Sequence, residues 1–204
     1  MITTIKNSIL ASILIGFGVA VSLYIGSPIG TFLFSFGLIG VCYLGADLFT
    51  GKCGYYWRES DNKRLELILI LLINLVAGWG IGALLSLVDP ALMTKATEKI
   101  ASWEEMSLFA YFIKSVFCGA IMYIAVDCWK SKGTPLGIIY GVPLFIFCGF
   151  QHCIANIVFL GLANTMSPLI LVCILGNLLG SIIIDLLTPK PEPLIDELKI
   201  NIGF

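Results

Sequence analysis

Apolar residues fall into six runs long enough to cross a lipid bilayer. Because the hydrocarbon core needs roughly 20 apolar helical residues, we interpret the runs as membrane spans, at about residues 8–25, 28–46, 66–88, 106–126, 135–151 and 166–187. Two shorter apolar stretches, about 53–58 and 154–163, follow the second and fifth runs. Each is too short to cross alone, but it can complete a crossing that the preceding run begins.

This pattern predicts an all-α integral membrane protein built from two halves of three spans each. An odd number of spans per half inverts the second half relative to the first. The second and fifth runs both reach a polar patch, at residues 45–52 and 149–156, before the apolar sequence resumes. Interrupted spans at matching places in inverted halves point to a binding site near the bilayer midplane.

Positive charges gather on one side of the predicted bundle. Six spans place most lysines and arginines together, namely Lys6, Lys52, Arg58, Lys63, Arg64, Lys130, Lys132, Lys190 and Lys199. The other side keeps Lys95 and Lys99, diluted by Asp89, Glu98, Glu104 and Glu105. The positive-inside rule then predicts a multi-pass protein of the inner (plasma) membrane with both termini in the cytoplasm. We expect one transmembrane domain over 1–188 and a short cytoplasmic tail over 189–204.

Composition agrees with a membrane environment. Hydrophobic residues make up 58% of the chain, charged residues only 12%, and mean hydropathy is +0.99. A soluble domain of this size leaves too much surface wet to hide that share, so we expect a lipid bilayer around the protein. A net charge of -1 offers no basic face for nucleic acid. The first run lacks an Ala-x-Ala-like end and is interpreted as a span rather than a signal peptide.

The seven cysteines are expected to act as small hydrophobic residues. They form no CxxC pair and mostly lie inside apolar runs, at Cys42, Cys53, Cys118, Cys128, Cys148, Cys153 and Cys173. A metal cluster or a disulfide framework is the less favoured alternative. We therefore expect no metal and no cofactor.

Polar residues inside the two breaks are the candidates for chemistry. His152, the only histidine, can attract an anion or hand it a proton, since its ring offers a donor and an acceptor when neutral and two donors when protonated. Equally, it can be a structural residue that holds the break. Thr50 can contact the ring or the substrate, or cap the next half-helix. Asn156 can cap a helix or brace the break, and we group it with the pore centre.

Other residues inside the runs suggest a pore. Lys114 lies within the fourth run, where a cation is costly and usually faces the bundle interior; it can concentrate anions or pair with backbone carbonyls. Apolar narrowings can form at Phe34, Leu38, Leu48, Phe49 and Phe145, although each can equally face lipid or fill the core. Asp47 is a candidate for pinning its loop, whereas Asp127 and Asp185 are expected at the membrane interface.

Three motifs in order resemble the formate/nitrite transporter family, which includes hydrosulfide channels. Gly45-Ala46-Asp47-Leu48-Phe49-Thr50-Gly51 is similar to its Gly-Ala-[Glu/Asp]-Leu-Phe-Thr-Gly loop, and Gly149-Phe150-Gln151-His152-Cys153-Ile154-Ala155-Asn156 to its Gly-Phe-Glu-His-x-Ile-Ala-Asn signature. Leu175-Gly176-Asn177-Leu178-Leu179-Gly180 matches its last-span motif. The resemblance implies an aquaporin-like fold of six spans, the second and fifth broken, assembled as a homopentamer with one pore per protomer.

The resemblance also implies roles for individual residues. It places His152 at the pore centre beside Thr50, the five apolar residues at constrictions, and Lys114 and Lys99 as basic residues that attract the anion. Departures occur at three places. Residues 119–122 replace the family's Asn-Trp-Leu-Val, which removes a polar pore-lining or helix-packing group. Gln151 replaces a glutamate and cannot hold the histidine positive by charge. Lys52 replaces an asparagine and adds a cation next to the loop.

Three classes of function follow. The leading hypothesis is a channel or transporter, not an enzyme, that moves formate, nitrite or hydrosulfide passively or with a proton. The alternative is an aquaporin-like pore for a small neutral solute, which the two neutral replacements favour. A membrane enzyme pairing His152 with Cys148 or Cys153 is a third class, although no third partner is visible.

Overall fold

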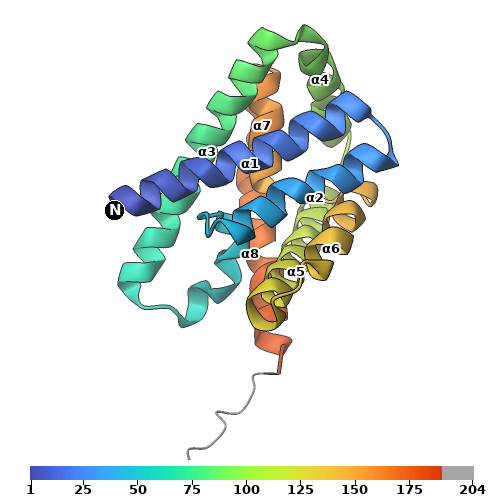
Figure 1. Ribbon diagram of the computed structural model, residues 1–204. Coiled ribbons are helices and arrows are strands. Elements are labelled where there is room, and N and C mark those ends of the chain that lie inside the picture. The colour runs from blue at the N-terminus through green and yellow to red at the C-terminus, as the bar shows by residue number, and fades with distance from the viewer. Residues whose placement is uncertain (190–204) are drawn as a thin grey trace, which may run out of the picture.

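The structure is a computed structural model that describes residues 1–189, and all regular secondary structure in this part of the chain is helical (Figure 1). In chain order the elements are α1 (Ile2–Ile25), α2 (Pro28–Tyr43), the 3₁₀ helices η1 (Phe49–Gly51) and η2 (Cys53–Arg58), α3 (Asp61–Val88), α4 (Pro90–Glu104), α5 (Leu108–Lys132), α6 (Leu136–Phe147), α7 (Cys153–Leu162) and α8 (Leu169–Leu187). The predicted tail, after its first residue, lies outside the described residues, together with Lys190 and Lys199.

Four of these helices are long and apolar enough to cross a membrane, namely α1, α3, α5 and α8. The helices α2, α6 and α7 are apolar but shorter. The second predicted run ends as a helix at Tyr43 and the fifth at Phe147, and each is followed by non-helical backbone. Helix then resumes as η1 and η2 in the first half and as α7 in the second, so both interruptions lie where the sequence places them.

The two interruptions have the same backbone geometry. Gly45 and Gly149 both adopt φ +64°, a left-handed conformation that glycine reaches without strain. The residue after each glycine closes the end of the preceding helix in the same way. The backbone N–H of Ala46 donates to the carbonyl of Val41 at 2.9 Å, and that of Phe150 to the carbonyl of Phe145 at 2.9 Å. The motifs at 45–51 and 149–156 thus end their helices identically and turn the chain into the protein.

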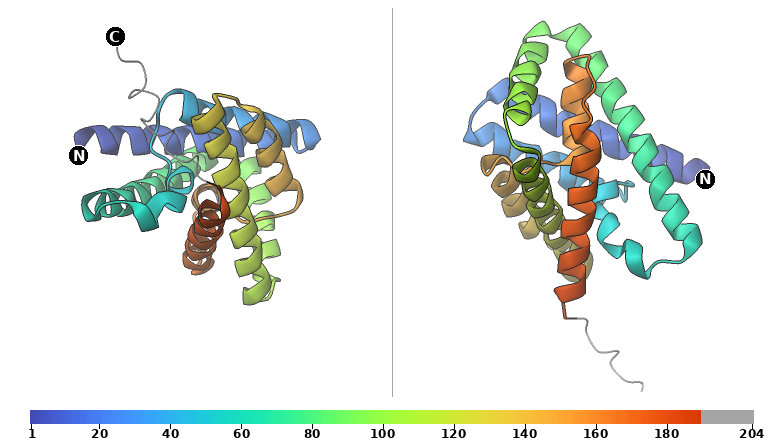
Figure 2. Two further views of the ribbon diagram at one scale, coloured as in Figure 1. Left: turned by 90° about the horizontal axis from the view of Figure 1, so that it is seen from below. Right: turned by 180° about the vertical axis from the view of Figure 1, so that it is seen from behind.

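Helices pack closely through small residues. Close pairs are formed by α5 with α8, α1 with α2, and α3 with α7, and the two views in Figure 2 show α5 and α8 lying against each other. A Cβ atom at Gly119 would overlap the backbone of Asn177 on α8. The glycine that replaces the family's asparagine therefore permits the close contact between the two helices.

The helix α4 is absent from the sequence prediction. Asp89 caps its first turn by accepting from the backbone N–H of Ala91 at 2.9 Å, and Pro90 stands at its first position. One face is buried, at Leu92, Ala96, Ile100 and Trp103, and the helix packs on α7. Its charged residues make the segment too polar to be recognised as a membrane span. The spacing of its buried residues is nevertheless that of an amphipathic helix.

The acidic residues at the span ends behave differently from one another. Asp47 forms an ion pair with Lys52 at 2.5 Å, as expected of a residue that pins the loop. Asp185, predicted at the membrane interface, is buried within the protein: it accepts from the guanidinium of Arg58, from Tyr123 Oη at 2.6 Å and from Trp57 Nε1 at 2.7 Å. These donors come from η2 and α5. Because they satisfy the carboxylate with hydrogen bonds and an opposite charge, Asp185 can be buried.

Replacing Asp185 by Ala should lower the free energy of unfolding by about 2 kcal/mol, because Arg58 and two further donors lose their acceptor. Denaturant titration in detergent micelles measures the change. The control is Asp127→Ala: Asp127 is half-buried and accepts from Tyr55 Oη at 3.0 Å, so its loss should cost clearly less. Equal stability of the two variants would contradict the anchoring role of Asp185.

Candidate pore centre

Thr50 and His152 meet at the centre of the protein. Thr50 lies in η1, and His152 is the residue immediately before α7. Thr50 Oγ1 and His152 Nε2 are 2.9 Å apart, and the two residues are only 1% and 2% exposed. The turns at Gly45 and Gly149 direct both segments inward, so two residues distant in sequence form one hydrogen-bonded pair.

The contacts of the imidazole define its tautomer. His152 Nδ1 accepts from the backbone N–H of Ala155 at 3.0 Å and so caps α7. An accepting Nδ1 carries no proton, which places the proton of the neutral ring on Nε2. Nε2–H therefore donates to Thr50 Oγ1. Within residues 1–189 the Thr50 O–H has no acceptor of its own, which leaves it free to donate to a bound anion or solute.

Two cavities lie on either side of this pair. The first, about 50 Å3, is lined by Phe34, Phe145, Gln151, His152 and Asn156 among others, and Lys99 lies at its edge. The second, about 400 Å3, is lined by residues that include Val41, Leu48, Gly51, Lys52 and Lys130. We call them the outer cavity and the inner cavity, after the predicted membrane sides.

Four of the five predicted constriction residues lie along the line between the cavities. Phe34 and Phe145 touch edge to face, with ring centroids 6.1 Å apart, and the Phe145 ring stacks on that of His152 at 5.7 Å. Along α2, Phe34 lines the outer cavity and Val41 the inner one, with the buried Leu38 between them. Leu48 lines the inner cavity.

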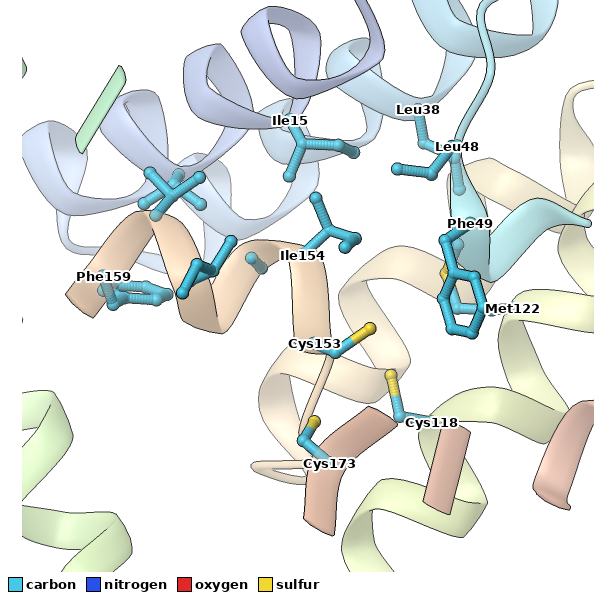
Figure 3. Packing of buried hydrophobic residues seen from close by; sticks show 14 of the residues in the cluster. Ile15, Leu38, Leu48, Phe49, Cys118, Met122, Cys153, Ile154, Phe159 and Cys173 are labelled. Atoms are coloured by element: carbon cyan, nitrogen blue, oxygen red, sulfur yellow. The ribbon is translucent and has the colours of Figure 1, made fainter. Parts of the chain in front are cut away.

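The fifth predicted constriction residue, Phe49, packs in the protein interior. It lines neither the outer nor the inner cavity and belongs to the buried hydrophobic cluster, in which Figure 3 shows it with Leu38, Leu48 and Met122. Its backbone N–H donates to Asn74 Oδ1 at 2.9 Å. These contacts give Phe49 a packing role, and its place at a constriction stays a prediction.

Asn156 braces the second break rather than capping a helix. Its Nδ2 donates to Gln151 Oε1 at 2.9 Å and to Tyr111 Oη at 3.0 Å. The Gln151 side chain in turn donates to the carbonyl of Gly149 at 2.9 Å. Asn156 also borders the outer cavity. The neutral amide of Gln151 is thus tied into the fold, and it places no charge beside His152.

Two lysines lie near the outer cavity. Lys99 of α4 borders it, and the Lys114 ammonium lies beside Gly149. Lys99 keeps contact with water, yet partial burial, the larger cause, and the neighbouring Lys114 charge lower the pKa of its ammonium. Neither lysine forms an ion pair within the described residues. Because no carboxylate neutralises them there, they leave a positive potential at this mouth.

Sequence reasoning missed two residues near the site: Asn74, and Lys130 as a residue that borders the inner cavity. Asn74 is completely buried in α3 and contacts the first break through its side chain. An amide within an otherwise apolar run is the signal that marks it. Lys130 borders the inner cavity, donates to the carbonyl of Gly51 at 3.3 Å, and lies 4.2 Å from the centre of the Tyr55 ring.

The thiols beside the pore are not arranged as a metal site. Figure 3 shows Cys118, Cys153 and Cys173 in the buried cluster near the start of α7, and all three are free and fully buried. Among residues 1–189 no group of three or more His, Cys, Asp or Glu residues is arranged to hold a metal ion. Cys173 instead donates to the carbonyl of Gln151 at 3.2 Å.

Apolar helices of spanning length, two interrupted segments and a polar pair between two cavities define the class of membrane channels and transporters. The chain belongs to one family of that class: residues 1–184 match the family model described as formate/nitrite transporter. Expectation and comparison agree on the family.

Relatives support the same assignment. Two proteins of Bacillus subtilis (strain 168) named as uncharacterized transporters are each 28% identical to the chain: YwcJ over 185 residues, 74% of this chain and 70% of YwcJ, and YrhG over 150 residues, 65% of this chain and 56% of YrhG. These relatives are transporters, which fits a protein that is not an enzyme.

Solved structures share the fold. An "FNT family ion channel" superimposes with a TM-score of 0.76 at 21% identity, covering 92% of this chain and 91% of its own. A "Pentameric formate channel with formate bound" gives a TM-score of 0.67 at 18% identity, covering 91% of this chain and 92% of its own. At such low identity the likeness establishes the fold alone.

Truncating Phe145 should open the path between the outer cavity and the Thr50–His152 pair. We expect Phe145→Ala to raise osmotic water permeability of proteoliposomes several-fold, because both ring contacts disappear and a narrow apolar segment widens. Stopped-flow light scattering measures it. Phe147→Ala, on the same helix but 59% exposed, is the control and should leave permeability unchanged. If Phe145→Ala also left permeability unchanged, Phe145 would not form a constriction.

Proposed function

We propose that this protein conducts small monovalent anions, with formate, nitrite and hydrosulfide as candidate substrates, through a pore centred on Thr50 and His152. The observation that carries the proposal is the buried Thr50–His152 pair between two cavities, in which the Thr50 hydroxyl has no acceptor among residues 1–189. A hydroxyl donor in a dry centre can replace part of the water shell of an anion. Membership in the formate/nitrite transporter family supports this class of substrate.

The proposed architecture has six crossings in two inverted halves. In it, α2 with η1 and η2 forms the broken second crossing, and α6 with α7 the broken fifth. Support comes from the matching turns at Gly45 and Gly149. We also propose a homopentamer, since a neighbouring fold is described as a pentameric formate channel. The lysine distribution supports placement in the inner membrane with both termini in the cytoplasm.

The proposed path has three steps. Lys99 and Lys114 concentrate the anion at the outer mouth. Phe34 and Phe145 then strip its water, because apolar narrowings exclude hydrated ions. At the centre Thr50 donates to the anion, assisted by the positive end of the α7 dipole. On the inner side the anion passes Leu38 and Leu48 and reaches the cavity bordered by Lys52 and Lys130.

The contacts of His152 favour passive movement over proton coupling. An imidazolium carries protons on both nitrogens, so charging the ring would break the bond from the Ala155 N–H to Nδ1. Burial without a carboxylate partner further opposes the charged ring. A proton-coupled cycle would therefore have to break the hydrogen bond between the Ala155 N–H and His152 Nδ1 at each turnover. Stabilisation of the anion by the Thr50 hydroxyl leaves that bond intact.

Two other functions fit less well. An uncharged centre suits a neutral solute, but two unneutralised lysines at the outer mouth favour anions. An enzyme that uses His152 as a base with Cys148 or Cys153 lacks a free ring nitrogen, because Nδ1 and Nε2 are both engaged. We therefore retain anion conduction.

Uptake into proteoliposomes tests the proposal. Formate, nitrite and hydrosulfide should be compared at two pH values for the wild type, His152→Phe and His152→Asn. Asparagine can still cap α7 but cannot reach Thr50 in the same way, so we expect both variants to lose or alter selectivity while His152→Asn keeps the fold. Unchanged anion flux in both variants would overturn the role of His152, and a wild type without anion uptake would refute the function.

Lys99→Met should reduce anion uptake several-fold at low ionic strength, because the mouth loses a charge that steers the anion. The effect should fade near 1 M salt, where screening acts within about 3 Å. Initial rates of uptake across a salt series measure it. Lys95→Met on the same helix is the matched control, since Lys95 donates to the carbonyl of Leu23 at 2.6 Å and borders neither cavity. Equal losses in the two variants would contradict local steering.

A further inference from the structure

Two buried asparagines occupy equivalent positions in the two halves of the chain. Asn74 lies in α3 and Asn177 in α8, and both are 0% exposed. Asn74 Oδ1 accepts from the backbone N–H of Phe49 at 2.9 Å, while its Nδ2 donates to the carbonyls of Ser8 at 2.9 Å and Asp47 at 3.1 Å. One amide thus joins α1, α3 and the first break.

Asn177 makes the same three bonds in the second half. Its Oδ1 accepts from the backbone N–H of Cys153 at 2.9 Å, and its Nδ2 donates to the carbonyls of Ser115 and Gln151, both at 2.8 Å. It therefore joins α5, α8 and the second break. The repetition of donor, acceptor and helix roles argues that the arrangement serves a common purpose.

Each amide holds the backbone on both sides of one residue. The bonds of Asn177 reach Gln151 and Cys153, which flank His152. Those of Asn74 reach Asp47 and Phe49, which flank Leu48 and lead directly to Thr50. Only a side chain with both a donor and an acceptor satisfies this pattern, since a carboxylate cannot donate and an aliphatic group does neither.

These bonds also affect what an anion can meet. The N–H groups of Phe49 and Cys153 stand at the starts of η1 and α7, where unpaired amides attract anions. Asn74 Oδ1 accepts the N–H of Phe49, and Asn177 Oδ1 accepts that of Cys153. These two N–H groups are therefore not available to an anion at the centre, which limits how tightly it is held.

We propose that Asn74 and Asn177 are positioning residues that set the separation and orientation of Thr50 and His152 and thereby determine which anions pass. The inference rests on the proposed function, because it concerns the selectivity of that pore. It assigns no contact between either asparagine and the anion. Each acts through the break that it holds.

A double-mutant cycle tests the inference. Asn74→Ala, Thr50→Val and their combination are reconstituted, and the ratio of formate uptake to acetate uptake is measured for each. We expect Asn74→Ala to change the ratio by about fivefold or more, and to change it little further once Thr50 is valine, since coupled residues do not act additively. Asn177→Ala combined with His152→Asn forms the parallel cycle.

Controls separate positioning from loss of fold. Ser181→Ala removes a hydroxyl that is equally buried on α8 and donates to the carbonyl of Gly119 at 2.9 Å, so it should leave the ratio unchanged. If an alanine variant does not purify as the wild-type oligomer, Asn74→Ser and Asn177→Ser replace it, because serine keeps one donor and one acceptor at smaller size.

The outcomes are distinguishable. A wild type that takes up none of formate, nitrite, hydrosulfide and acetate refutes the proposed function and this inference with it; a wild type that conducts nitrite or hydrosulfide instead of formate is tested with that anion in place of formate in the ratio. A conducting wild type whose asparagine variants keep its formate-to-acetate ratio overturns the inference alone. The inference is also wrong if the changes in ratio multiply independently with those of Thr50→Val, because that is the behaviour of residues that only stabilise the bundle.

Discussion

Backbone that leaves a helix inside a bilayer must find its hydrogen-bond partners within the protein, because lipid offers none. The two breaks in this chain meet that constraint with side chains. Asn74 and Asn177 accept hydrogen bonds from the first N–H of η1 and of α7, and His152 Nδ1 accepts one from Ala155, the third residue of α7. The positions of Asn74, Asn177 and His152 around the proposed pore centre follow from this requirement.

The constraint also decides the chemistry of the histidine. A ring that accepts a backbone N–H at Nδ1 must present its proton at Nε2, and Thr50 lies there as the acceptor. Structural and functional readings of His152 are therefore not alternatives. The bond that closes the α7 cap sets the ring so that the Thr50 hydroxyl can face a solute, and the same bond opposes a second proton on the ring.

Much of this arrangement is predictable from the sequence. A polar patch that interrupts an apolar run marks a break, so the pattern locates His152, Thr50 and Asn156. Partners that come from distant segments are less visible. The partners of Asp185, Arg58 and Tyr123, reach it only in the folded chain, and Asn74 is one amide in a long span. The helix α4 is not predicted, because hydropathy identifies membrane spans and not amphipathic helices that pack on the bundle.

Charge along the proposed pore is confined to its two ends. Lys99 borders the outer cavity, and the Lys114 ammonium lies near Gly149 of its lining. Lys130 and the Asp47-paired Lys52 border the inner cavity, whereas Thr50, His152 and Gln151 contribute only dipoles at the centre. A fixed cation deep in the protein would be costly to bury and would hold an anion tightly. Water softens the attraction of lysines at the mouths, so an anion can gather there and still leave. A neutral glutamine before the histidine, which departs from the family pattern, fits this division because it keeps the centre free of charge.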